Sequence, residues 1–94
     1  MRAKNFRGYV NKESRAVMIR HNSLECWIVN FVNKSNKVSK RRKSQWAFTD
    51  TKVSAITTIR RRNIKLPQSG WERVSLRDKD GKTWDDLVLR FWNH

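Results

Sequence analysis

The chain has 94 residues, with 22 Lys and Arg against eight Asp and Glu and a net charge of +14 at pH 7. This length allows one domain with one modest core, and it leaves no room for a deep substrate cavity beside that core. No apolar stretch suits a secretion signal or a bilayer span, so we expect a cytoplasmic or nucleoid-associated protein that is not secreted and binds no membrane.

The positive charge is distributed unevenly along the chain. Residues 1–70 hold 17 Lys and Arg and only three acids, which accounts for the whole net charge, whereas residues 71–94 hold five of each sign. A surface selected for solubility alone mixes the two signs. Excess positive charge confined to one part of a small domain predicts a polyanionic partner, and DNA or RNA is the commonest one.

The first third of the chain is predicted to form β-strands. Runs rich in β-branched and aromatic residues predict strands over 7–10, 15–20 and 24–32, joined by short polar turns. The third run is apolar on both faces, which is typical of a central strand, and its Cys26 is predicted to be a buried thiol. An antiparallel meander of three strands is the simplest arrangement of these runs.

A cationic segment follows the third strand. Residues 33–45 contain six Lys and Arg, no acid and no hydrophobic periodicity. Mutual repulsion and low hydrophobicity predict a long, exposed and mobile loop. We expect Trp46 and Phe48 to return the chain to the core.

One helix is predicted after this loop. Asp50 or Thr51 suits the N-cap, and the helix is expected to run to about Arg62. Val53, Ile56 and Ile59 recur at a spacing that places them on one packed face. Cations in the last turn interact favourably with the helix dipole.

The C-terminal segment allows two structures. Strand-like alternation over 71–77 and 82–91, around the turn-forming residues 78–81, predicts a hairpin. A helix that starts after Thr83 is the alternative, because apolar residues also recur there at helical spacing. We favour the hairpin, and a terminal edge strand that ends in Phe91-Trp92 would also offer a place for a second copy of the chain to pair.

These elements together predict an α+β fold in a single domain over residues 1–94. It would contain a small twisted antiparallel β-sheet, formed by the meander and the C-terminal hairpin. One packed helix and the long basic loop would complete it.

Three basic features are candidates for nucleic-acid contacts. Lysines and arginines of the loop would bind phosphates, and the arginines at the helix end offer guanidinium forks for phosphates or guanine edges. The third feature is an N-terminal basic arm of Arg2, Lys4 and Arg7, of a kind that lies along a phosphate backbone or enters a minor groove, and a merely frayed terminus is the alternative. Trp46, directly after the loop, is the aromatic residue best placed to be exposed and to stack on a base. The full predicted set is Lys34, Lys37, Lys40, Arg41, Arg42, Lys43, Trp46, Arg60, Arg61 and Arg62.

Catalytic signals are weak. The sequence shows no metal-ligand spacing, no phosphate-cradling glycine loop and no nucleophile motif, so we expect no cofactor and no metal. The predicted function is non-catalytic binding to the phosphate backbone of DNA or RNA in a regulatory role. The alternative is an inhibitor or adaptor that docks on an acidic surface of an enzyme or nucleoprotein complex. A small RNase that uses Tyr9 or His21 is a third, weaker hypothesis.

Overall fold

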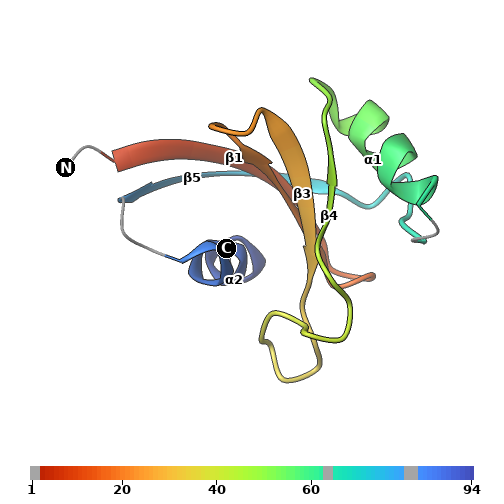
Figure 1. Cartoon of the computed structure of the whole chain (residues 1–94). Helices are drawn as coiled ribbons and strands as arrows, with labels where there is room; N and C mark the ends of the chain where they lie inside the picture. The colour runs from red at the N-terminus through yellow and green to blue at the C-terminus, as the bar shows by residue number, and fades with distance from the viewer. Residues whose placement is uncertain (1–2, 63–64, 80–82) are drawn as a thin grey trace.

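The computed structural model describes residues 3–62, 65–79 and 83–94, which form a five-stranded antiparallel sheet and two helices (Figure 1). The strands lie in the order β4-β3-β2-β1-β5. Along the chain the elements are β1 (Ala3–Asn11), β2 (Ala16–His21), β3 (Cys26–Phe31), β4 (Gln45–Ala47), α1 (Lys52–Arg60), β5 (Glu72–Lys79) and α2 (Trp84–Trp92). The predicted α+β class with a small antiparallel sheet is confirmed.

The predicted meander is confirmed as β1, β2 and β3. β1 pairs with β2 from Gly8↔Ile19 to Asn11↔Ala16, and β2 pairs with β3 along its whole length. β3 lies between β2 and β4, so it is an interior strand as its two apolar faces indicate. Cys26 is buried, and this burial raises the pKa of its thiol although nearby Arg20 acts in the opposite direction.

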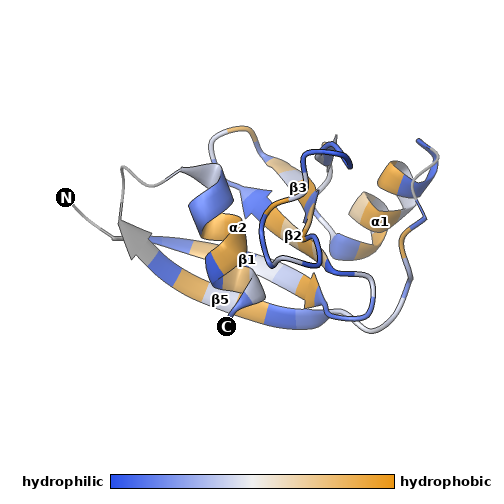
Figure 2. Ribbon diagram, turned by 90° about the horizontal axis from the view of Figure 1, so that it is seen from below, coloured by the Kyte–Doolittle hydropathy of each residue, from blue (hydrophilic) through white to orange (hydrophobic). Residues whose placement is uncertain are grey.

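Each face of the sheet packs against one helix (Figure 2). Because successive side chains of a strand point to opposite faces, each strand contributes to both sides. One cluster joins α1 to Met18, Val29 and Phe31. The other joins α2 to Val17 and Ile19. Neither helix has the length and apolar composition that crossing a bilayer would require.

The helix predicted after residue 50 is confirmed as α1. Thr51 is the N-cap, and its hydroxyl accepts a hydrogen bond from the backbone N–H of Ser54 at 3.2 Å. The packed face lies further round the helix than predicted, because Ala55, Ile56 and Ile59 are buried and Val53 is 69% exposed.

The predicted C-terminal hairpin is wrong. β5 pairs with β1 over its whole length, from Val10↔Glu72 to Ala3↔Lys79, and the residues from 84 onward form α2. Residues 80 and 81 of the predicted turn, and residue 82 at the start of the second predicted strand, lie outside the described residues. The fold therefore has two packed helices instead of one, and no edge strand ends in Phe91-Trp92 to pair with a second copy.

Burial explains why the helix replaces the hairpin. The sheet face made by Val10, Val17 and Ile19 needs an apolar cover, and a strand added at the edge of the sheet would leave it open to water. A helix in this segment places Leu87, Val88, Phe91 and Trp92 on that face. Gly8 allows the close contact, because a Cβ there would lie 2.5 Å from the Met18 carbonyl oxygen and 2.9 Å from Phe91 Cε1.

We expect Thr83→Ala to lower the free energy of unfolding by about 1 kcal/mol. The Thr83 hydroxyl caps α2 by accepting a hydrogen bond from the N–H of Asp86 at 3.2 Å. Thr83→Ser keeps the hydroxyl, and its stability should match the wild type. Urea denaturation followed by circular dichroism measures both variants, and an unchanged midpoint for Thr83→Ala would contradict the capped helix.

Candidate nucleic-acid interface

The connection between β3 and β4, residues 33–44, carries six of the predicted contact residues. Its first half has a defined backbone, because Val32 pairs with Val38 and the Asn33 side-chain oxygen accepts hydrogen bonds from the N–H groups of Ser35 and Lys37. The long featureless loop predicted over 33–45 is not confirmed, and Gln45 belongs to β4. Mobility of the connection stays a prediction.

Side chains from distant parts of the chain hold this connection in place. Arg15 Nε donates to the Val32 carbonyl at 3.0 Å, and its guanidinium also donates to the side-chain oxygen of Asn36 at 2.7 Å. The indole N–H of Trp92, on α2, donates to the same oxygen at 3.4 Å. Trp92 is buried, and Arg15 has a structural role.

Four of the predicted cations gather around one hollow of about 520 Å³. No residue that lines it is acidic, and in the described part of the chain none of the four side chains pairs with a carboxylate. Their charges add in one place, which makes the hollow a site of positive potential. We call it the connection hollow, and its cations are Lys34, Lys37, Lys40 and Arg41.

Arg42 and Lys43 follow the hollow and differ from each other. The Arg42 guanidinium lies 3.6 Å from the centroid of the Phe31 ring, where it covers the edge of the core. Its contribution to stability is therefore partly packing and cation–π attraction. Lys43 is exposed and remains available for a partner.

The end of α1 meets β4 through an arginine and a tryptophan. Arg60, Arg61 and Arg62 are all exposed, and the Arg62 guanidinium lies 4.9 Å from the centroid of the Trp46 ring. Arg62 therefore contacts Trp46. Arg60 and Arg61 do not line the connection hollow.

Trp46 is exposed, as expected for a ring that could stack on a base. The prediction that Trp46 and Phe48 return the chain to the core is wrong. Trp46 is 42% exposed and Phe48 66% exposed, and the rings form a T-shaped pair with centroids 4.8 Å apart. Ala47 is the buried residue of β4, because its side chain points to the opposite face of the strand. The two rings form an exposed aromatic surface directly after the connection.

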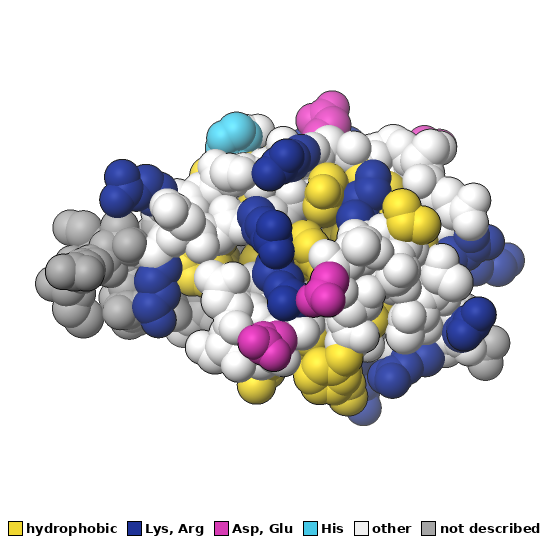
Figure 3. Space-filling model, turned by 90° about the horizontal axis from the view of Figure 1, so that it is seen from above, with side chains coloured by type: hydrophobic (Ala, Val, Ile, Leu, Met, Phe, Trp, Pro, Cys, Tyr) yellow, Lys and Arg dark blue, Asp and Glu magenta, His cyan; other side chains and the backbone are white. Residues whose placement is uncertain are grey.

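A second group of cations lies on the sheet, on the face away from α2. Figure 3 looks onto this face and shows Lys and Arg side chains in a row across it, with hydrophobic side chains alongside and Asp or Glu side chains at the lower end of the row. Arg7 of β1 and Arg73 and Arg77 of β5 are exposed there. Sequence reasoning placed Arg7 in an N-terminal arm and treated residues 71–94 as neutral, so it missed this group. The alternation of polar 73, 75 and 77 with apolar 74 and 76 was the available signal.

The two residues considered for RNase chemistry are not brought together. Tyr9 packs in the cluster on the α1 side, with its ring centroid 5.8 Å from that of Trp27. His21 stacks on Trp84 of α2 at 5.2 Å, and its Nδ1 accepts a hydrogen bond from the N–H of Leu24. Because they lie on opposite sides of the sheet, Tyr9 and His21 cannot act on the same bond.

Comparison of the chain with protein-family models, with curated proteins and with solved structures gave no match.

Proposed function

We propose that the protein is a non-catalytic nucleic-acid-binding domain that contacts the phosphate backbone of DNA or RNA and regulates by occupying its site. The connection hollow is the observation that carries this proposal. Four cations converge there without an acidic lining residue, and their binding to phosphates would release counterions from the nucleic acid. Lys43 lies two residues after Arg41 and is also exposed, so it adds to the same cationic segment.

The aromatic surface beside the connection supports contacts with unpaired bases. Trp46 and Phe48 present exposed rings, and Arg62 adds a guanidinium over the Trp46 ring. Exposed rings next to cations are typical of surfaces on which bases of single strands stack. A ligand could therefore place its phosphates on the connection and a base on Trp46.

A salt-series binding titration tests the proposal. Duplex DNA, single-stranded DNA and RNA of matched length are compared between 50 mM and 1 M salt. If five to seven phosphates of the duplex are contacted, the slope of log K against log salt is expected to be about −4.5 to −6. Binding that is absent, or insensitive to salt, would contradict the proposal.

An acidic protein surface could bind to the same cations. A purification experiment distinguishes an acidic protein partner from a nucleic acid. Nucleic acid that co-purifies with the protein and is released at high salt supports the proposal. A stoichiometric protein partner that remains after nuclease treatment contradicts it and supports the inhibitor or adaptor hypothesis.

We expect Trp46→Ala to weaken binding to single strands by about 5- to 150-fold, because stacking contributes about 1–3 kcal/mol per base. Duplex binding should change little, since paired bases are not available for stacking. Leu24→Ala is the control, because Leu24 is 56% exposed in the turn between β2 and β3. An equal loss for duplex and single strands would argue against stacking.

A further inference from the structure

The part of the sheet made by β1 and β5 has one covered face and one open face. Phe6, Val74 and Leu76 pack in the cluster on the α2 side. α1 packs beside β4 at the far edge of the sheet and reaches β1 at Tyr9, where the Lys52 ammonium lies 4.9 Å from the ring centroid. Beyond Tyr9 the face of β1 and β5 is open. That open face carries a row of exposed polar side chains, namely Asn5, Arg7, Arg73, Ser75 and Arg77.

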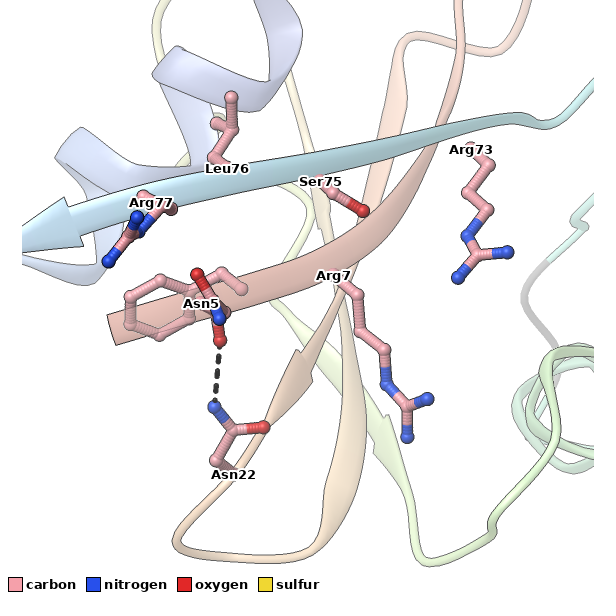
Figure 4. Close-up of a pocket in the computed structure, with 8 residues that line it drawn as sticks. Asn5, Arg7, Asn22, Arg73, Ser75, Leu76 and Arg77 are labelled. Atoms are coloured by element: carbon pink, nitrogen blue, oxygen red, sulfur yellow. Dashed lines mark hydrogen bonds between the residues drawn. The ribbon is translucent and has the colours of Figure 1, made fainter. Parts of the chain in front are cut away.

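The strand register places three arginines around one small residue. Arg7 pairs with Ser75, while Arg73 pairs with Tyr9 and Arg77 with Asn5. Arg7 is therefore the diagonal neighbour of both other arginines, at a spacing of about 7–8 Å. Because Ser75 is short, the space above it stays open, and the surrounding side chains form a pocket of about 430 Å³ (Figure 4). We call this the arginine pocket.

Amide groups complete the wall of the arginine pocket. Asn22, in the turn between β2 and β3, donates a hydrogen bond from its side-chain nitrogen to the Asn5 carbonyl oxygen at 3.2 Å. Figure 4 shows the side chains of Arg7 and Arg73 on the same side of the two strands, with Leu76 extending the other way toward α2. The pocket is thus rich in hydrogen-bond donors and has no acidic lining residue.

The three guanidinium groups are exposed, and none is directly opposite another in the strand register. In the described part of the chain none of the three arginines pairs with a carboxylate, and the only ring contact among them is Arg7 at 5.8 Å from the centroid of Trp27. Several guanidinium forks around one hollow match the oxygens of a phosphate group.

We propose that the arginine pocket binds a phosphodiester of the nucleic-acid strand, as a second contact separate from the connection hollow; this inference rests on the proposed function. The pocket adjoins the turn before β3, and the hollow follows the other end of β3. A six-residue strand spans about 17–20 Å. A ligand therefore has to extend over at least about five base-pair steps, at about 3.4 Å each, to reach both.

The test compares Arg7→Gln/Arg73→Gln/Arg77→Gln with Ser75→Leu, which fills the pocket without changing the charge. Both are expected to remove one phosphate contact, so the salt slope becomes shallower by about 0.9 for duplex and about 0.7 for single strands. Affinity at 0.1 M salt then falls about five- to tenfold. Because the three arginines are exposed and form no ion pair in the described part of the chain, the triple variant should unfold at about the same temperature as the wild type.

Lys65→Gln is the charge control, because Lys65 is exposed and lines neither the arginine pocket nor the connection hollow. Its slope should match the wild type. The inference is overturned if the triple variant and Ser75→Leu bind as the wild type does while neutralising the connection hollow still weakens binding. If the wild-type protein shows no salt-dependent binding, the proposed function itself is contradicted, and the inference about the arginine pocket is contradicted with it.

Discussion

Phe91→Ala is expected to lower the free energy of unfolding by about 3–5 kcal/mol, as truncation of a large buried aromatic residue does. Phe91 is fully buried in the cluster between α2 and the sheet, beside Val17 and Ile19. Its ring lies against β1 at Gly8, so no side chain is available there to fill the space that it leaves. Urea denaturation followed by circular dichroism measures the loss.

Phe48→Ala is the matched control for this experiment. It makes the same substitution at a ring that is 66% exposed, so the change in stability should stay within about 0.5 kcal/mol. Equal losses at the two positions would mean that α2 does not cover the sheet. A stable Phe91→Ala protein would favour the C-terminal hairpin over the helix.

Neutralising the connection hollow is expected to have the largest effect on binding. Lys34→Gln/Lys37→Gln/Lys40→Gln/Arg41→Gln removes four cations that pair with no carboxylate in the described part of the chain, so the fold should be retained. If each contacts one phosphate, the salt slope for duplex becomes shallower by about 3.6 and affinity at 0.1 M salt falls about 10³-fold. Arg42 is left in place because it packs over Phe31.

The control for this variant keeps the charge and changes the side chains. Lys34→Arg/Lys37→Arg/Lys40→Arg/Arg41→Lys should bind with the wild-type salt slope, since phosphate neutralisation depends on charge. If both variants lose affinity equally, the loss comes from the changed shape of the connection and not from its charge. If the glutamine variant binds with wild-type affinity, the connection hollow is not part of the nucleic-acid interface.

Local signals were sufficient for the meander and for α1. Strand runs, polar turns and the Thr51 cap each depend on residues close together in the chain, and the structure confirms them. The cationic connection was visible in the same way, because charge is counted along the chain. Its convergence around one hollow was not, since the fixed backbone depends on Arg15 and Trp92 from distant elements.

The C-terminal segment and the arginine pocket were decided by tertiary structure. Residues 83–91 satisfy both a strand pattern and a helix pattern, and the need to cover the apolar face at Val17 and Ile19 selected the helix. Arg7 and Ser75 are far apart in the chain, and only the pairing register of β1 with β5 places them side by side. The sequence by itself determined the charge and the local elements, because these depend on near neighbours. Tertiary structure decided which faces are covered and which cations meet, because these depend on register and packing between distant segments.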